Sequence, residues 1–476
     1  MSIRYYANQK GILILTARDE SKSVIVSMFT SKLENLLQWI KNTSDETSNP
    51  SSHSYISPKI TVKDVQDFGR SIYSSTAINK SELLFRIPPS FLLNSTTVIR
   101  HITRHNHSIK LTNPCYLSIF VPYKTVSDKY TAVYASLSLD QLLELTSFQL
   151  LSLYITFETQ RGSDSFWKPF WDMLPDLDDL RLTPLVWRVT KAPQWEHLWS
   201  LLPRATQAHA EKVWSRFVHD VDVVHQLLST QGLSSEEIHQ YLPQERFLWA
   251  WMCVNSRCLY MELPQSKDNH DNFTMAPYVD FLNHACDDQC TLKINSIGFQ
   301  VSTTSKYAAG DQLFLSYGPH SNTFLLCEYG FVLPSDNTWN DLDITHIILP
   351  LLKPKQVDYL KDQNYYGEYT LNANSGISFR TEVVLAVLQE QTPGESRRLN
   401  GLLNGNMDGL VYQKNSNTLL KKILEKVVYD CDQKMKLEYN DDIDEFTKER
   451  KRVIGILYRD MKLIARTELE KLELLT

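Results

Sequence analysis

The chain has 476 residues, of which 42% are hydrophobic and 22% are charged, and its formal net charge is -6. A chain of this length can bury a large core, and its mild negative charge gives no general reason to bind nucleic acid or an anionic membrane. No apolar run approaches the ~20 residues of a membrane-spanning helix, and the early run "GILIL" is too short for the core of a signal peptide. We therefore expect a monomer of the cytoplasm or the nucleus, with no membrane and no nucleic-acid partner.

The N-terminal part is predicted to hold one helix and a linker. Leu33, Leu36, Leu37 and Ile40 recur at the spacing of one helical face, which predicts a short amphipathic helix. Residues 42–57 are rich in Ser, Asn and Thr, a composition typical of a flexible linker. We accordingly assign residues 1–58 to an N-terminal helix and linker that precede the first folded domain.

Residues 59–340 are predicted to form a β-containing domain with a helical insertion. Short apolar runs in 59–93, such as "KITVKDV" and "ELLFRIPPSFLL", are broken by Gly, Asn and Pro and indicate a small, irregular sheet. From about residue 138 the pattern turns helical, with capping-box pairs at Thr146 with Gln149 and at Ser234 with Glu237. Residues 148–157 have almost no polar face, so we expect that helix to be buried all round. The insertion is placed at about residues 100–245.

Strand patterns return in residues 278–317, where "TLKINS" and "FQVST" alternate and "QLFLSYG" runs into a glycine turn. Beyond about residue 341 the sequence is again mostly helical, and we assign residues 341–476 to a separate helical domain. The predicted order is thus strands, a large helical insertion, strands again, and a helical tail.

Cysteine usage is typical of a reducing compartment. The seven cysteines are an odd number and include no CxxC pair, so we expect free thiols. Cys286 and Cys290 are four residues apart, but only His284 accompanies them in the sequence, and we therefore expect no metal site.

Four segments carry most of the chemical character: "DFGRSI" (67–72), "NSRCLY" (255–260), "DFLNHACD" (280–287) and "LFLSYGPHSNTFLLCEYGF" (313–331). Taken singly, each has an ordinary structural explanation. Gly69 fits a turn, Arg257 an ion-paired helix end, and Tyr317 a core aromatic, while Asn283 and His284 fit hydrogen-bonded core positions. It is their combination, in this order, that points to a function.

In combination the four segments resemble the SET-domain protein methyltransferases, in the branch typified by the Rubisco large-subunit lysine methyltransferase. The resemblance runs from about residue 59 to 341 and extends to "INKSELLFRIPPSFLLN" and "DSFWKPFWDMLP". It implies an α+β fold: a pseudoknotted SET-domain β-fold, interrupted by a large helical insertion and followed by a helical substrate-binding domain of the Rubisco-methyltransferase type. Such a pseudoknot is an exception to the usual unknotted topology of proteins.

The resemblance implies that S-adenosylmethionine is the cofactor. Gly69, Arg70 and Ser71 would pass its methionine end on their backbone, where small residues permit close approach. Asn283 and His284 would bind its amino-purine and amino-acid parts, largely through main-chain atoms, which would compensate the burial of these polar residues.

The remaining site residues follow from the same resemblance. Arg257 would lie in the cofactor pocket and Ser256 beside the substrate channel. Tyr317 matches the catalytic tyrosine at the end of that channel, and Tyr329 would form another aromatic wall in contact with cofactor and substrate. Asp280 would line the substrate side, although a strand-end cap or an ion-pair partner is an equally good explanation for it.

The implied reaction is displacement of a methyl group from a sulfonium by an amine. The amine must be neutral, whereas a free lysine has a pKa of about 10.4. An apolar, aromatic channel penalises the ammonium form, and the nearby sulfonium charge acts in the same direction. Holding the two reactants in line supplies much of the remaining rate, and no dedicated base is strictly required.

Two positions depart from the family pattern. The cofactor loop usually reads Gly-x-Gly, but here Ser71 takes the second glycine position, and Ser81 stands where glycine is common in a nearby turn. A serine with a positive φ costs of order 1 kcal/mol, so Ser71 is expected to weaken cofactor binding if its position requires that conformation. The chain also lacks the cysteine-rich segment that closes the site in many histone methyltransferases.

Three functions remain open at this point. The first is methylation of a lysine on a non-histone protein, with a ribosomal or translation protein as the expected target. The second is methylation of histidine, an activity of a relative that has an amide two residues after the arginine matching Arg257; here that position is Leu259, which suits an alkyl amine and would line the substrate side. The third is a non-catalytic adaptor, which the presence of Asn283, His284 and Tyr317 disfavours and Ser71 leaves open.

Overall fold

The computed structural model describes residues 16–42, 53–65, 69–112, 126–263, 271–287, 289–295, 298–335, 337–436 and 444–474. The chain packs as two compact units. The first comprises Met1–Leu174, Leu259–Asn283 and Gln289–Leu315, and the second comprises Pro175–Cys258, His284–Asp288 and Ser316–Thr476. The units follow packing and not chain order, so the domain boundaries at 58 and 340 stay a prediction.

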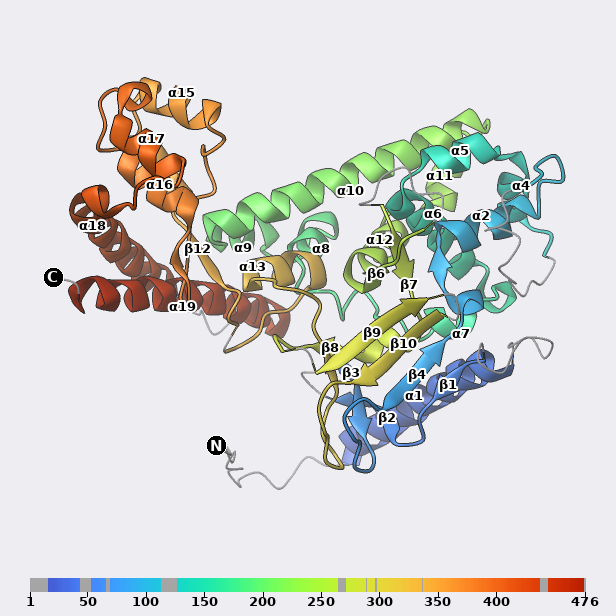
Figure 1. Cartoon of the computed structure of the whole chain (residues 1–476). Helices are drawn as coiled ribbons and strands as arrows, with labels where there is room; N and C mark the ends of the chain where they lie inside the picture. Colours follow the sequence, from blue (N-terminus) through green and yellow to red (C-terminus); the bar gives the residue numbers. More distant parts are fainter. Residues whose placement is uncertain are drawn as a thin grey trace. The chain divides into compact units, whose positions relative to one another are not determined.

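The first unit is built around short antiparallel strands. A four-stranded sheet has the order β1 (Tyr55–Ile56), β4 (Leu83–Ile87), β10 (Gly298–Thr303) and β9 (Cys290–Asn295), as Figure 1 shows. Opposite residues of β10 and β4, such as Val301 with Phe85 and Phe299 with Ile87, are fully buried and form one face of the core. Separate pairings join β2 (Ile60–Val65) to β3 (Gly69–Ser74), and β5 (Leu93–Asn94) to β7 (Phe273–Met275) and β6 (Cys258–Tyr260).

Most of the predicted strands are confirmed. The runs at 59–65, 82–93 and 291–303 contain β2, β4 with β5, and β9 with β10, whereas the run "QLFLSYG" contains only the two-residue β11 (Phe314–Leu315). The linker prediction differs at its end, because Tyr55 and Ile56 form β1 opposite Arg86 and Phe85. This pairing depends on a partner thirty residues away in the chain, which local composition does not reveal. Residues 43–52 of the predicted linker lie outside the described residues.

Helices complete the first unit. They are α1 (Thr16–Asn42), α2 (Ser95–Thr103), α4 (Lys129–Ser136), α5 (Leu139–Glu144), α6 (Ser147–Gln160) and α7 (Lys168–Trp171), with short turns η2 (Pro89–Phe91), η3 (Gly162–Asp164) and η4 (Val279–Phe281). The capping box predicted at Thr146 and Gln149 begins α6. Its residues Leu150, Leu151 and Leu153 are buried, as the sequence predicted.

Helix α1 contains the predicted segment 32–41 and extends further toward the N-terminus than the pattern indicated. Leu36 and Ile40 are fully buried on one face. The ring of Trp39 lies 4.7 Å from that of Phe91, 5.1 Å from that of Phe166 and 5.7 Å from that of Trp167, measured between centroids. The first unit therefore includes the end of this helix in its aromatic packing.

The second unit is mainly helical. Its first helices are α8 (Pro184–Val189), α9 (Trp195–Leu201), α10 (Arg204–Thr230), α11 (Ser235–Tyr241), α12 (Gln244–Arg257) and α13 (Asn322–Phe324), which continues into the π-helical turn η5 (Leu325–Tyr329). Its later helices are α14 (Thr345–Ile348), α15 (Pro354–Asp362), α16 (Phe379–Val387), α17 (Arg397–Leu403), α18 (Leu410–Met435) and α19 (Glu445–Leu474), with turns η6 (Leu349–Leu351) and η7 (Pro393–Glu395). The second predicted capping box, at Ser234 and Glu237, begins α11.

The long helices α18 and α19 lie side by side at the C-terminal end of this unit (Figure 1). Buried apolar side chains such as Val384, Leu424 and Leu457 form a continuous core between α16, α18 and α19. A three-stranded sheet of β12 (Asp341–Asp343), β13 (Thr370–Asn372) and β14 (Gly376–Ile377) lies in the same unit. Strands of two or three residues are too short to show an alternating pattern, so this sheet was not predicted. Within the described part of the chain, no helix is both long and apolar enough to cross a membrane.

Candidate active site

In the first unit, strand β3 presents the residues of the segment "DFGRSI"; Asp67 and Phe68 lie outside the described residues. Gly69 is exposed, and no atom lies within 4 Å of the place where a Cβ would project from it. Arg70 extends to donate to the main-chain oxygen of Met173. Ser71 is fully buried, and its hydroxyl accepts a hydrogen bond of 2.7 Å from the side-chain amide of Asn283. The structure thus brings Ser71 and Asn283 together across 212 residues of sequence.

The backbone at Ser71 is unstrained. Ser71 lies within β3 opposite Lys63, and its φ is not positive, so the cost foreseen for a serine here does not arise. The other serine that replaces a common glycine does carry this strain, because Ser81 has a φ of 63°. Left-handed backbone of this kind costs a residue with a Cβ roughly 1 kcal/mol.

A second strained position precedes Asn283 in the first unit. Tyr278 has a φ of 72° and is almost fully buried, with its ring against those of Phe85 and Phe281. A bulky residue at positive φ is a genuine outlier, and such outliers concentrate at functional sites. Burial raises the pKa of the Tyr278 hydroxyl well above its ordinary value. Asp280 follows in η4 and is partly exposed, and Leu259 lies in β6, also partly exposed.

The second unit begins again at His284, which is buried next to Tyr317. The backbone N–H of Tyr317 donates to Nδ1 of His284 over 3.1 Å, and the two rings lie 5.1 Å apart at an angle of 31°. Because Nδ1 is the acceptor, a neutral ring carries its proton on Nε2. The histidine therefore acts on the backbone of the tyrosine, holding the residue that the sequence analysis proposed as catalytic.

Aromatic rings surround Tyr317 within this unit. Its ring centroid lies 5.2 Å from that of Tyr329 and 6.4 Å from that of Phe331, which also packs against His284. Burial raises the pKa of the Tyr329 hydroxyl to about 12, so this phenol stays protonated at cellular pH. His320 stacks on Phe324 at 4.1 Å, and its Nε2 lies 3.2 Å from the main-chain oxygen of Tyr317.

Two glycines permit this arrangement of aromatic residues. Gly318, directly after Tyr317, has a φ of 129°, and a Cβ there would lie 2.7 Å from Nε2 of His320. Gly330, directly after Tyr329, has a φ of 82°, and a Cβ there would lie 2.7 Å from Oγ1 of Thr183. A side chain at either position would clash as well as strain the backbone. The "YG" pairs in the sequence thus have a steric reason.

Glu328, the residue before Tyr329, is held by three donors from two helices. Its carboxylate accepts from His209 and Arg216 of α10 at 2.7 Å each and from Asn255 of α12 at 2.9 Å. The same Asn255 amide donates to the main-chain oxygen of Glu328 at 2.9 Å. Burial alone would raise the pKa of Glu328, but the donors outweigh it and hold that pKa below its ordinary value. The π-helical turn η5, which ends at Tyr329, is thereby tied to α10 and α12.

The end of α12 carries two more of the predicted residues. Arg257 is its last residue and is partly buried. The hydroxyl of Ser256 donates to the main-chain oxygen of Met252 at 2.7 Å, one turn earlier in the same helix. Its proton is therefore engaged within the helix, and only its lone pairs remain to accept from a ligand.

Sequence reasoning missed the residues that support the tyrosines. Glu328 stands in "EYGF" and Asn255 in "NSRCLY", so both were inside quoted segments without receiving a role. His209 and Arg216 are seven residues apart, the spacing of one helical face, which is the only sign of them in the sequence. Among the described residues, no cluster of three or more His, Cys, Asp or Glu side chains is arranged to hold a metal ion.

The arrangement of these rings suits a reaction in which an ammonium group must first lose a proton. The clustered rings of Tyr317, Tyr329 and Phe331, tilted or edge-on to one another, offer a weakly polar surface, and such surroundings favour an amine over an ammonium. The faces of these rings also attract a cation before it loses its proton, by ~0.5 to 2 kcal/mol.

Comparison with known proteins found two matching family models. A family model described as "SET domain" matches residues 69–318, more than half of the chain, and one described as "Ribosomal lysine N-methyltransferase 2 C-terminal domain" matches residues 340–471. The chain is 29% identical to ribosomal lysine N-methyltransferase 2 of Saccharomyces cerevisiae, covering 83% of this chain and 89% of that protein. It is 26% identical to ribosomal lysine N-methyltransferase set11 of Schizosaccharomyces pombe, covering 85% of this chain and 90% of that protein.

A solved structure gives the same fold. The crystal structure of the SET domain of LSMT bound to lysine and AdoHcy aligns with a TM-score of 0.51 at 13% identity, covering 94% of this chain and 91% of that chain. The α+β fold predicted from the sequence, with its helical insertion and its helical C-terminal domain, is confirmed.

Proposed function

The chain belongs to the SET-domain family of protein-lysine methyltransferases, and from that premise we propose that it transfers a methyl group from S-adenosylmethionine to a lysine of a ribosomal protein. The carrying observation is the cluster of Tyr317, Tyr329 and Phe331. The backbone N–H of Tyr317 donates to His284, and the side-chain amide of Asn255 donates to the main-chain oxygen of Glu328, the residue before Tyr329. The target is supported by the two fungal relatives, which are ribosomal lysine N-methyltransferases. This chain matches both of them along nearly their whole length. We propose the cytoplasm or the nucleus as its compartment.

The cofactor supplies an electrophilic methyl group on a sulfonium. Open space beside Gly69 fits the close approach of a ligand to the backbone, since no atom lies within 4 Å of the position that a Cβ would take. The hydrogen bond between Ser71 and Asn283 gives the neighbouring polar groups a defined orientation. We assign to the cofactor the residues Gly69, Arg70, Ser71, Arg257, Asn283, His284, Tyr317 and Tyr329.

The chain itself has to orient and deprotonate the acceptor lysine. Tyr317 is proposed to orient the amine through its hydroxyl, and its phenol is held in place because His284 binds its backbone and Tyr329 packs on its ring. Desolvation between the aromatic rings lowers the pKa of the lysine, so that bulk water can take the proton. Ser256, Leu259, Asp280 and Tyr329 are assigned to the substrate side.

The proposal is tested with purified protein, tritiated S-adenosylmethionine and ribosomal proteins from a yeast lysate. We expect label on a small number of ribosomal proteins, and tandem mass spectrometry should place the added methyl groups on lysine. The Tyr317→Phe variant serves as the control for adventitious labelling. Label on histidine, or on proteins outside the ribosome only, would contradict the proposed acceptor.

A further inference from the structure

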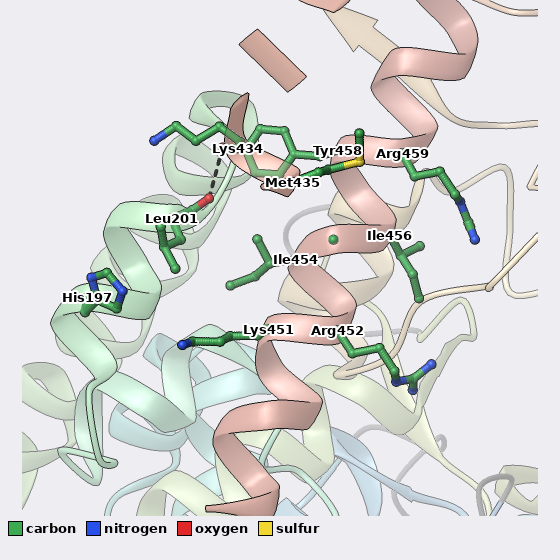
Figure 2. A pocket seen from close by; sticks show the side chains of 11 residues that line it. His197, Leu201, Lys434, Met435, Lys451, Arg452, Ile454, Ile456, Tyr458 and Arg459 are labelled. Atoms are coloured by element: carbon green, nitrogen blue, oxygen red, sulfur yellow. Dashed lines mark hydrogen bonds between the residues drawn. The ribbon is translucent and has the colours of Figure 1, made fainter. Parts of the chain in front are cut away.

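The second unit has a hollow whose lining includes none of the residues assigned to the reaction. A cavity of about 440 Å³ opens where α9, the end of α18 and the middle of α19 meet. Figure 2 shows the side chains that line it: His197, Leu201, Lys434, Met435, Lys451, Arg452, Ile454, Ile456, Tyr458 and Arg459, with Gly455 as the remaining lining residue. None of these described lining residues is acidic.

A glycine within α19 leaves room for the hollow. Gly455 lies within the helix, and no atom lies within 4 Å of the place where its Cβ would project. A glycine inside a helix costs about 1 kcal/mol relative to alanine. This helix therefore gives up stability at the point where the cavity opens, and any larger side chain at 455 would project into the cavity.

The floor of the hollow is apolar, and a hydrogen bond joins two of the helices that form it. Ile454 and Ile456 are buried beside Gly455, with Met435 and Leu201 on the neighbouring helices. The hydroxyl of Tyr458 donates to the main-chain oxygen of Leu201 at 2.9 Å, which ties α19 to α9 (Figure 2). The hydrogen bond joins two of the helices that line the cavity, and the apolar floor can accept a bulky apolar side chain.

The rim of the hollow is cationic. Lys434, Lys451 and Arg452 form no ion pair and no side-chain hydrogen bond within the described residues, whereas Arg459 donates to Asp460 and to the main-chain oxygen of Pro334. In Figure 2 the charged ends of Lys434 and Lys451 extend to one side of α19 and that of Arg452 to the other. Several like charges around an apolar floor repel a basic ligand and attract an acidic one.

We propose that this pocket docks an acidic peptide segment of the protein substrate, through one bulky apolar side chain flanked by carboxylates. This inference rests on the proposed function, because it takes the partner to be the methylated protein. A peptide fits better than RNA, since binding to single strands relies on exposed aromatic faces, and Tyr458, the lining tyrosine, is buried and hydrogen-bonded. A second contact of this kind would raise the local concentration of the acceptor lysine.

Binding is measured directly, without cofactor, by fluorescence anisotropy of the fluorescein-labelled peptide Asp-Glu-Leu-Phe-Asp-Glu on the full chain. Gly455→Leu fills the pocket with a residue that favours helix, and we expect it to raise the Kd about tenfold or more. Lys451→Glu should weaken binding similarly. Lys448→Glu is the matched control, because Lys448 is exposed on the same helix outside the pocket, and it should bind like the wild type.

Three results would overturn the proposal: no binding of the peptide at millimolar concentration, equal binding by Gly455→Leu and wild type, or tighter binding of polyuridylate than of the peptide at the same site. A melting curve for each variant separates loss of binding from loss of folding. In methylation assays on ribosomal protein, Gly455→Leu should raise KM and leave kcat unchanged. Failure of the proposed function would instead appear as absent lysine labelling by a chain that still binds the peptide.

Discussion

Nδ1 of His284 accepts a hydrogen bond from the backbone N–H of Tyr317, so the histidine of the "NH" pair positions the tyrosine of the "YG" pair. These residues are 33 positions apart in the sequence. Since a protonated imidazole has no acceptor nitrogen, the bond requires the neutral ring. The placement of the proposed catalytic phenol therefore depends on a neighbour that itself needs no contact with the substrate.

Removal of the Tyr317 hydroxyl is expected to affect turnover more than binding. Tyr317→Phe keeps the ring contacts with His284, Tyr329 and Phe331 and loses only the oxygen. We expect kcat to fall roughly ten- to a hundredfold, equivalent to about 1.4 to 2.7 kcal/mol of transition-state stabilisation. The Kd for S-adenosylmethionine, measured by titration calorimetry, should change little. Wild-type turnover in this variant would refute a role for the hydroxyl.

Restoring the common glycine at position 71 is expected to weaken cofactor binding. Ser71 has an unstrained backbone, so Ser71→Gly relieves nothing and deprives the Asn283 amide of its acceptor. A lost hydrogen bond of this kind costs about 0.5 to 1.5 kcal/mol. Calorimetry should therefore show a several-fold higher Kd for S-adenosylmethionine.

Ser74→Ala provides the comparison for this experiment. Ser74 is buried on the same strand, but its hydroxyl binds the main-chain oxygens of Ala308 and Asp311, away from Asn283. This variant should lose stability while keeping its affinity for the cofactor. Tighter cofactor binding by Ser71→Gly would show that Ser71 weakens the affinity for S-adenosylmethionine, contrary to this prediction.

The serine at position 81 should behave in the opposite way. Ser81 is exposed and has a φ of 63°, a conformation that glycine adopts without strain. Ser81→Gly is expected to raise the free energy of unfolding by about 0.5 to 1 kcal/mol. Chemical denaturation measures the change, and Ser305→Gly, at an exposed serine whose φ is not positive, should lower stability instead.

Stability is expected to depend on pH through Glu328. Its pKa lies below the ordinary value of 4.5 in the folded chain, so its contribution is present above pH 4.5 and is lost as pH falls through the folded value. Glu328→Gln removes this titration and should destabilise the chain near neutral pH by about 2 kcal/mol. The difference in unfolding free energy between wild type and variant should shrink as the pH drops below 4.5.

Glu328→Ala gives the matching test of position. It leaves His209, Arg216 and Asn255 without their common acceptor, and it should lower kcat more than Glu328→Gln does, because the turn that bears Tyr329 loses its anchor. A difference in unfolding free energy between wild type and Glu328→Gln that stayed constant from pH 7 to pH 4 would exclude titration of Glu328 as its source.

Local signals in the sequence predicted local structure well. Thr146 with Gln149 and Ser234 with Glu237 form capping boxes because each pair acts within one helical turn. The resemblance of "DFLNHACD" and "LFLSYGPH" to a family also identified the residues that the structure places beside one another, His284 and Tyr317.

Contacts that depend on the packing of distant segments escaped prediction. The φ of Ser71 follows from the pairing of β3 with β2, and it cannot be predicted from the residue type alone. In the sequence Glu328 is an ordinary charged residue. Its role depends on hydrogen-bond donors from α10 and α12, which are distant in the sequence. Strand β1 forms because it pairs with β4, although the composition of its own segment predicted a linker.

The packing of Trp39 has a practical consequence for anyone who shortens this enzyme. A truncated chain starting at residue 59 would look reasonable from the sequence. It would lack the Trp39 ring that packs on Phe91, Phe166 and Trp167, and these three large rings would then face water. A contiguous exposed hydrophobic surface of this kind promotes aggregation during purification. Trimming for crystallisation should therefore spare the second half of α1.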